Sequence, residues 1–393
     1  MSQAPSSVRD PVVGAGTSLY VHVPFCVVKC GYCDFNSYVV EDRSVHDRFL
    51  AALEAELART WPGGAPVSVF VGGGTPSLLE PERLERLFAT LARHVDLAAC
   101  GEVTMEANPE SLTEQKAAIA RTGGATRLSI GVQTFHPHHL RFLDRAHSAE
   151  RAEAAFTEAR RAGFENVSVD LMFGIPGETA AEWRSDLERA LALRPDHLSC
   201  YNLTFEPGTR LHRDLQRGSV APNEQEVDRD QFLATRAALA TAGYHAYEIS
   251  NFAGAGGPCR HNDHYWLQGD YVGVGPGASS HRRGVRTTNL KAVEAWADAA
   301  LAGIPCAASA ETLRPLQRAA EALWLGIRRA DGVDLDAVGV RLGWAVEAHF
   351  AAVLASHERK GWIEREGASV RLTETGLLLA DRVGGDYLAI GVA

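Results

Sequence analysis

The chain has 393 residues, 46% hydrophobic and 22% charged, which is enough for two or three domains with a large buried core. Its 39 Lys and Arg against 49 Asp and Glu give a net charge of −10, which argues against nucleic acid as the main partner. No run approaches the roughly 18 apolar residues of a membrane span, and residues 1–17 lack the basic and then apolar order of a signal peptide. We therefore expect a cytoplasmic protein. Residues 1–17 are rich in Gly, Pro, Ser and Ala without periodicity, which predicts a disordered tail.

Short apolar runs alternate with longer helical patterns over residues 18–243, which is typical of a parallel sheet with helical crossovers. Six strand–helix units fall short of the eight that close a barrel, so we expect an α/β fold, a partial (open) parallel β/α barrel. The predicted strands are Leu19–Val23, Val67–Val71, Glu102–Glu106, Arg127–Val132, Val167–Met172 and His197–Leu203. The predicted helices are Arg43–Thr60, Pro81–His94, Thr113–Thr122, Ala149–Ala162, Ala180–Leu193 and Glu224–Ala242. Capping boxes are expected at Ser77–Glu80 and Thr179–Glu182.

Two further regions follow the predicted barrel. Residues 244–310 are rich in Gly, His and aromatic side chains, a composition that favours binding loops extending the core. Residues 311–393 return to helical patterns with one hairpin, which predicts a mainly helical, winged-helix-like carboxyl-terminal domain. Its predicted elements are helices at Leu313–Arg328, Leu335–Leu342, Ala345–Lys360 and Thr373–Arg382, with the hairpin turn at Glu366-Gly367.

Three of the seven cysteines, Cys26, Cys30 and Cys33, lie within eight residues directly after the first predicted strand. Their C-x3-C-x2-C spacing puts three thiols on one loop, and thiolates are soft ligands that suit zinc or iron–sulfur clusters. Three thiolates leave a fourth position missing or open. A zinc ion completed by His22 or Asp34, and unconnected buried thiols, are the alternatives.

Polar and glycine residues end several of the predicted strands. Gly72–Thr75 follows the second strand, Glu106 and Gln133 end the third and fourth, and Asp170 lies in the fifth. Glycines let backbone amides approach a ligand closely, and charged groups in apolar strands are costly unless they are paired. Because the carboxyl ends of parallel strands share one edge, we expect these motifs to converge with the cysteine loop on one cleft. Polar packing inside the barrel is the alternative for each residue alone.

The cysteine loop resembles the signature of radical S-adenosylmethionine (SAM) enzymes. That resemblance implies a [4Fe-4S] cluster held by Cys26, Cys30 and Cys33, whose open iron chelates SAM and whose reduced form passes one electron to the sulfonium. An electron donor such as a flavodoxin or ferredoxin is implied as a partner.

The order of motifs is similar to the family of oxygen-independent coproporphyrinogen III oxidase, from residue 18 to about residue 290. The motifs are Tyr20-x5-Cys26, GGGTP (72–76), MEANP (105–109), GVQTF (131–135), LDRAH (143–147) and DLMFGIPGE (170–178). The resemblance implies a first SAM site lined by Tyr20, Gly73 and Glu106, and a second SAM pocket matched by Tyr32, Gly74, Thr75, Gln133, Arg145 and Asp170.

Two departures from the oxidase pattern resemble instead the HemW group of heme chaperones. Phe35 stands where the oxidases have a fourth cysteine, and HNDHYW (261–266) matches the HN-x-x-YW motif of that group. This implies a protein that binds heme and delivers it to acceptor proteins. Neutral imidazole is a good axial ligand for heme iron, so His261 is the candidate ligand, with Tyr265 and Trp266 packed on the macrocycle. The alternative is that His261 only hydrogen-bonds a loop.

Two other functions are weighed against the heme chaperone. The first is oxidative decarboxylation of coproporphyrinogen, which the family resemblance also allows. The second is redox-sensing DNA binding through the carboxyl-terminal domain, but residues 311–393 carry 10 Lys and Arg against 12 Asp and Glu and so lack a basic footprint.

Overall fold

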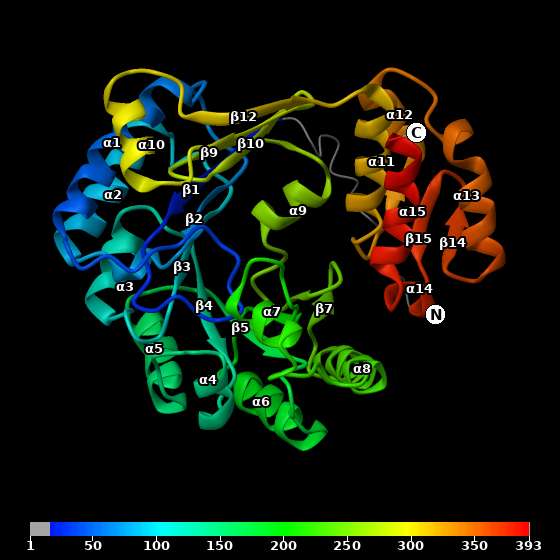
Figure 1. The fold of residues 1–393 in the computed structure, drawn as a ribbon, viewed down its shortest axis with the longest axis horizontal. Coiled ribbons are helices and arrows are strands. Elements are labelled where there is room, and N and C mark those ends of the chain that lie inside the picture. Colours follow the sequence, from blue (N-terminus) through cyan, green and yellow to red (C-terminus); the bar gives the residue numbers. More distant parts are fainter. Residues whose placement is uncertain (1–15, 393) are drawn as a thin grey trace, which may run out of the picture.

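The computed structural model describes residues 16–392, so the predicted tail lies outside the described residues except for its last two. Its centre is a run of six parallel strands in chain order (Figure 1). Each helical crossover returns the chain to the end of the sheet at which the previous strand began, so neighbouring strands pair in parallel. In β1 and β2, for example, Leu19 lies opposite Val69. The strands are β1 (Thr17–Val23), β2 (Val69–Gly73), β3 (Val103–Ala107), β4 (Arg127–Gln133), β5 (Asn166–Phe173) and β6 (His197–Asn202).

The crossover helices cover the outer face of these strands (Figure 1). In α2 the buried residues Leu84, Leu87, Phe88 and Leu91 follow the three-and-four spacing of one helix face, which packs on the sheet. The six long helices are α1 (Ser44–Thr60), α2 (Pro81–His94), α3 (Glu114–Thr122), α5 (Ala149–Arg161), α6 (Ala180–Ala192) and α8 (Gln225–Thr241). The short ones are η1 (Pro76–Leu78), α4 (Pro137–Phe142) and α7 (Arg210–Gln216).

The open barrel is confirmed, and residues 244–310 explain why it does not close. This stretch adds an antiparallel pair beside β6 and a parallel strand followed by antiparallel strands beside β1, so the two edges never meet. The expectation of binding loops here is therefore wrong for much of the stretch, because short strands and a buried helix with Trp296 lie in the sheet and core. The elements are β7 (His245–Ala246), β8 (Asn251–Ala253), α9 (Arg260–Trp266), β9 (Asp270–Val274), β10 (Ser279–Arg282), β11 (Val285–Asn289), α10 (Val293–Leu301) and β12 (Ala307–Thr312).

One of the two predicted capping boxes forms. Thr179 and Glu182 cap α6 reciprocally, as predicted. The box at Ser77 is wrong, because α2 begins at Pro81 after Glu80 and the Ser77 hydroxyl is hydrogen-bonded to Ser111 Oγ at 2.7 Å.

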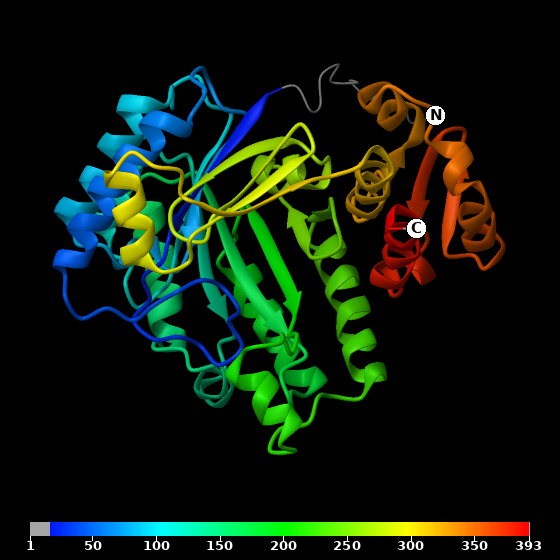
Figure 2. The same ribbon diagram turned by 45° about the horizontal axis from the view of Figure 1, so that its top comes forward.

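The carboxyl-terminal domain has its own hydrophobic core and lies beside the barrel on the side of α8 and α9 (Figures 1 and 2). Its order of helix, strand, two helices and hairpin gives a small three-stranded sheet β13-β15-β14, as the winged-helix-like prediction requires. The elements are α11 (Pro315–Gly326), β13 (Val333–Asp334), α12 (Leu335–Leu342), α13 (Glu347–Arg359), β14 (Ile363–Glu366), β15 (Ser369–Leu372), α14 (Glu374–Leu377) and α15 (Ala380–Val392).

The single helix predicted at Thr373–Arg382 is wrong: the structure has the short α14 and then α15, which continues to Val392. Glycine disfavours a helix interior, yet Gly384 and Gly385 lie inside α15. Gly384 is needed for packing instead, since a Cβ atom there would lie 2.0 Å from Trp324 Cδ1 on α11.

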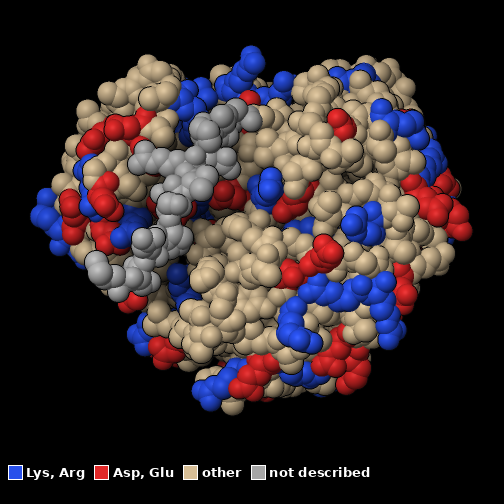
Figure 3. All heavy atoms as spheres, turned by 180° about the vertical axis from the view of Figure 1, so that it is seen from behind, with Lys and Arg blue, Asp and Glu red and all other residues tan. Residues whose placement is uncertain are grey.

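Within residues 16–392 no helix is both long and apolar enough to cross a bilayer. On the face seen in Figure 3, basic and acidic side chains are interspersed and form no single basic field.

Gly384 and Gly385 of α15 provide a matched pair of substitutions. Gly384→Ala should lower the free energy of unfolding of the carboxyl-terminal domain by about 1–3 kcal/mol, because its methyl group overlaps the Trp324 ring. Gly385→Ala meets nothing within 4 Å and should stabilise the domain by about 0.5–1 kcal/mol through helix propensity. Urea unfolding followed by tryptophan fluorescence measures both, and equal effects of the two substitutions would contradict the packing argument.

Candidate cofactor-binding site

A cavity of about 620 Å³ opens at the carboxyl ends of the central strands. Residues 24–43, which follow β1, cross these strand ends (Figure 2). Ten of the predicted site residues line the cavity, so the expected convergence of motifs is what the structure contains. They are Cys26, Cys30, Tyr32, Cys33, Gly73, Gly74, Glu106, Gln133, Arg145 and Asp170.

The cysteine loop is held in place by its backbone. Cys26 N–H donates to Tyr38 O at 2.9 Å, which closes the loop on itself. At the far side, Gly31 N–H donates to the carboxylate of Asp144 at 2.9 Å, and Gly31 O accepts from Leu211 N–H at 2.8 Å. The loop is therefore tied both to the chain after α4 and to α7.

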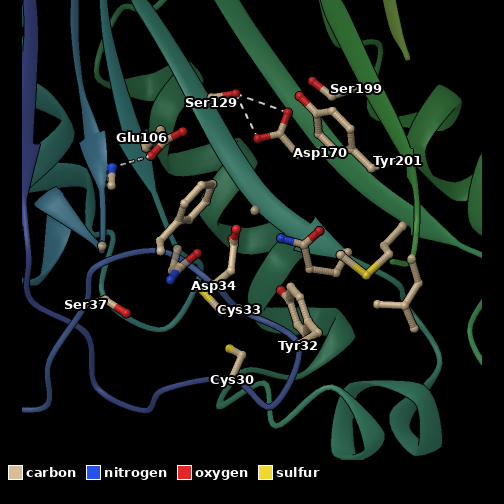
Figure 4. Close-up of a pocket in the computed structure, with 18 of the residues that line it drawn as sticks. Cys30, Tyr32, Cys33, Asp34, Ser37, Glu106, Ser129, Asp170, Ser199 and Tyr201 are labelled. Carbon is tan, nitrogen blue, oxygen red and sulfur yellow. Dashed lines mark hydrogen bonds between the residues drawn. The ribbon is translucent and has the colours of Figure 1, made fainter. Parts of the chain in front are cut away.

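The three thiols are free, and each is half-buried at the cavity wall (Figure 4 shows Cys30 and Cys33). Burial raises the pKa of Cys26 and raises that of Cys33 to about 11, and the neighbouring thiols raise both further. Three thiolates are therefore stable here only beside positive charge. Arg145 supplies part of it, because its Nη1 lies 3.7 Å from Cys30 Sγ.

This donor set fits a metal centre with one open position better than a closed zinc site. Among the described residues that line the cavity there is no histidine and no fourth cysteine. His22 is excluded as a zinc ligand, since its Nδ1 is hydrogen-bonded to Tyr20 Oη at 2.9 Å and its Nε2 to Asn36 O at 2.8 Å. Asp34, the other predicted zinc ligand, does line the cavity, but a carboxylate is a hard donor beside three soft ones.

The glycine turn after β2 packs against the cysteine loop. Gly74 N–H donates to Val23 O at 2.8 Å and Thr75 N–H donates to Phe25 O at 2.7 Å. A Cβ atom on Gly74 would lie 2.7 Å from both carbonyl oxygens, so only glycine allows this approach. The expectation that these amides face a ligand is therefore wrong for residues 74 and 75, whose N–H groups bind the loop.

Two carboxyl groups lie in one wall of the cavity (Figure 4). Glu106 accepts a hydrogen bond from Gly73 N–H at 3.0 Å, and burial raises its pKa to about 7. Asp170 accepts from Ser129 Oγ at 2.8 Å and from Ser168 Oγ at 3.1 Å, and burial raises its pKa too. A cationic or hydrogen-bond-donating ligand would restore the ionised form of Glu106.

Arg145 and Gln133 form the neighbouring wall. The Arg145 guanidinium donates to Asn108 Oδ1 at 2.7 Å and to Gly131 O at 2.8 Å, which fixes it between β3 and β4. Gln133 has φ of 68° at an irregularity in the β4–β5 pairing. A left-handed glutamine is uncommon, and such strain is concentrated at functional sites.

Three predicted site residues do not line the cavity. Thr75 is buried behind it, 3.6 Å from Cys26 Sγ, and its hydroxyl accepts from Asn108 Nδ2 at 2.9 Å. Tyr20 lies on β1 with its hydroxyl bound to His22. His261 is only 1% exposed, and burial lowers its pKa to about 3. Its Nδ1 is hydrogen-bonded to Ser68 Oγ at 2.8 Å, whereas its Nε2 has no hydrogen-bond partner among the described residues.

Several cavity residues escaped the sequence analysis. Asn108 stands inside the MEANP motif and could have been singled out as the polar residue after a strand end. Ser129 and Tyr201 share a wall with Asp170 (Figure 4) but belong to ordinary strand patterns. Arg328 and Asp381 come from the carboxyl-terminal domain, and only the tertiary structure places them at the cavity.

The fold and the three-thiol loop define a protein of the radical SAM class. Residues 20–190 match the Radical SAM superfamily and residues 313–379 match the HemN C-terminal domain. The fold is that of coproporphyrinogen III oxidase (HemN) from Escherichia coli. The two structures align with a TM-score of 0.82 over 95% of this chain and 90% of that one, at 24% identity.

The sequence is similar to two curated heme chaperones over nearly its whole length. It is 36% identical to heme chaperone HemW of Bacillus subtilis, over 94% of this chain and 99% of that protein. It is 39% identical to heme chaperone HemW of Mycobacterium tuberculosis, over 95% of each. The chain therefore belongs to the HemW family, as its sequence motifs predicted.

The carboxylate that anchors the cysteine loop can be tested without touching the thiols. Asp144 adopts a left-handed conformation that asparagine tolerates, so Asp144→Asn should keep the backbone but weaken the bonds to Gly31 and Arg210. We expect hydrogen exchange in residues 26–38 to become several-fold faster. Asp214→Asn, which removes a carboxylate 3.8 Å from Arg210 but none of the loop contacts, is the control. Equal exchange in the two variants would show that Asp144 does not hold the loop.

Proposed function

We propose that this chain binds a [4Fe-4S] cluster and SAM and acts as a heme chaperone that delivers heme to acceptor proteins. The family relationship over nearly the full length supports this proposal, and the observation that carries it is the set of three thiols on one cavity-lining loop. When bound, the cluster supplies one-electron chemistry and an open iron position. Cys26, Cys30 and Cys33 hold it, and Arg145 offsets the negative charge beside Cys30.

Phe35 distinguishes this loop from that of the oxidases. Its side chain is 58% exposed, and Val27, Val28 and Val39 on the same loop are also exposed. An exposed apolar loop beside a cofactor is costly in an isolated protein and favours contact with an apolar ligand or a partner. Heme and the acceptor protein are both partners of this kind. A cysteine at position 35 would not provide this exposed apolar side chain.

The polar walls of the cavity are the proposed SAM subsites. Glu106 accepts hydrogen bonds from the SAM amino group, Gly73 holds the Glu106 carboxylate, and Tyr20 supports the first site from behind the wall. Gly74 and Thr75 shape the other subsite through the loop they bind. Its remaining contacts come from Tyr32, Gln133, Arg145 and Asp170. A flavodoxin or ferredoxin is the proposed electron donor, and the proposed location is the cytoplasm.

His261 remains the proposed axial heme ligand. Burial keeps its imidazole neutral, which is the ligating form, and its Nε2 is unpartnered in the described structure. The Tyr265 ring, from the same short helix α9, packs edge-on against the His261 ring, with 4.7 Å between the ring centroids. Because His261 is almost wholly buried, heme binding through this residue requires α9 to move away from β2.

Anaerobic reconstitution followed by two parallel assays tests the function. Reconstituted protein should bind heme with a Soret band and should leave coproporphyrinogen unchanged in the presence of SAM and reductant. The triple Cys26→Ser, Cys30→Ser, Cys33→Ser variant should lose the brown cluster absorbance and most of its iron, because the loop at residues 24–43 contains no other cysteine. Turnover of coproporphyrinogen by the wild-type protein would establish the oxidase instead.

The heme ligand is tested in the same preparation. His261→Ala should shift or diminish the Soret band, whereas His264→Ala, another buried histidine of α9, should not, because its Nε2 is hydrogen-bonded to Asp270 O at 2.8 Å. Unchanged spectra in His261→Ala, with unchanged circular dichroism, would move the heme site elsewhere.

SAM affinity should depend on pH through Glu106. Its pKa is raised to about 7 by burial, so the carboxyl group is charged above that pH and neutral below it. SAM binding that needs the carboxylate should weaken about tenfold between pH 8 and pH 6, as the ionised fraction falls. Equilibrium dialysis with cluster-loaded protein measures this change.

The Glu106→Gln variant is the control for that slope, because it preserves the shape and cannot titrate. Its residual pH dependence reports the titration of SAM itself. If wild-type and Glu106→Gln proteins show the same slope, Glu106 does not hold the amino group.

A further inference from the structure

A second group of ligand-type side chains lies away from the cysteine loop, where α4 meets α6. His138 and His139 stand on α4, and Glu182 stands in the first turn of α6. Their ligand atoms all lie within 4.8 Å of one another. None of the three lines the cavity of the cysteine loop, and the only role predicted for any of them is the helix cap formed by Glu182.

The imidazoles face the Glu182 carboxylate. His138 Nε2 lies 3.0 Å from Glu182 Oε1, and His139 Nε2 lies 3.7 Å from Glu182 Oε2. The two rings are 4.0 Å apart between centroids. A tetrahedral zinc ion with bonds of about 2.0–2.1 Å separates its ligand atoms by roughly 3.3 Å, so ligand atoms that all lie within 4.8 Å of one another need adjustments of up to about 1.5 Å.

An unsatisfied atom inside this group points to a missing ligand. The His139 side chain is 4% exposed, and its Nε2 has no hydrogen-bond partner in the described structure. A buried polar atom without a partner is rare and costs about 1–3 kcal/mol.

The carboxylate of Glu182 can serve two partners. Its Oε2 accepts from Thr179 N–H at 2.9 Å and from Thr179 Oγ1 at 2.8 Å, as part of the α6 capping box. Among the residues that the structure describes, its Oε1 has only the exposed His138 as a partner. A metal could take Oε1 and leave the cap intact, since carboxylates often bind zinc through a single oxygen.

We propose that His138, His139 and Glu182 form a site for a zinc ion, with water as the fourth ligand. A donor set of two imidazoles and one carboxylate binds zinc in preference to the harder calcium and magnesium ions. The ion would clamp α4 to α6. His136, whose Nε2 lies 3.1 Å from Glu182 O, supports the clamp from the preceding turn without ligating the metal.

The clamp has a structural consequence for the cavity. α4 follows the strained Gln133 by only a few residues, and the intervening Thr134 and Phe135 are tied to Asp186 of α6 at 2.6 and 2.9 Å. Zinc at this position would therefore restrict the segment that leads out of the cofactor cavity. It would do so from outside the cavity.

The test uses the full chain in the triple Cys26→Ser, Cys30→Ser, Cys33→Ser background, so that cluster thiols cannot take up the metal. Co²⁺ is the spectroscopic probe and Zn²⁺ the competitor. We expect one Co²⁺ per chain with visible absorption typical of four-coordinate nitrogen and oxygen ligands, no sulfur-to-cobalt charge-transfer band, and displacement by Zn²⁺. Zn²⁺ should also raise the midpoint of thermal unfolding.

His138→Gln is the decisive variant, because the side chain is 52% exposed and its loss leaves the core intact. It should weaken Co²⁺ and Zn²⁺ binding at least tenfold and abolish the thermal shift. His94→Gln is the matched control, since His94 lies 3.8 Å from Glu54 without a second imidazole and should leave metal binding unchanged.

Three results would overturn the proposal. They are the absence of a bound metal in the parent chain, equal binding by His138→Gln, and a charge-transfer band that assigns the cobalt to a remaining thiol. None of them bears on heme or cluster binding, so the zinc site and the proposed function fail separately.

Discussion

The close contact between the glycine turn after β2 and the cysteine loop is the constraint on which the site depends. Gly74 and Thr75 donate to the carbonyl groups of Val23 and Phe25, and a side chain at position 74 would collide with both oxygens. This contact directs the chain after β1 back across the strand ends. The three thiols therefore face the cavity because of a backbone interaction, and Thr75 reaches Cys26 only because the turn lies so close.

The same edge of the sheet concentrates polar groups that the core would otherwise exclude. Glu106, Asp170 and Arg145 each form a hydrogen bond with a strand neighbour, so the cavity wall is preorganised before any ligand arrives. Burial nevertheless leaves both carboxyl groups with raised pKa values. A ligand that brings positive charge or hydrogen-bond donors therefore gains more here than at the surface, because the low dielectric strengthens each interaction.

The sequence allowed much of the fold to be predicted because strand and helix periodicities are local. Strand ends carry the site, so placing β3, β4 and β5 also placed Glu106, Gln133 and Asp170. Failures arose where tertiary packing overrides local pattern. The helix predicted to end at Arg382 continues as α15 through Gly384, which packs under Trp324. Ser77 has the sequence of a helix cap but is hydrogen-bonded to Ser111. Arg328 and Asp381 reach the cavity from a domain whose docking has no local signature.

The histidines show how far residue type alone can be taken. His261, His264 and His139 are all buried, yet their surroundings differ in one respect that sequence cannot provide. His264 has a carbonyl partner for its Nε2, whereas the Nε2 atoms of His261 and His139 have none within residues 16–392. An imidazole held neutral with an unpaired nitrogen is unfavourable unless a ligand, a water molecule or a conformational change completes it. His139 lies beside two further side chains that can ligate a metal, Glu182 and His138. The neighbours of His261 are instead the rings of Phe70 and Tyr265. The ligands of the proposed metal site are therefore adjacent in this structure, whereas the proposed heme ligand His261 is covered by its own helix and would bind heme only if α9 moved away from β2.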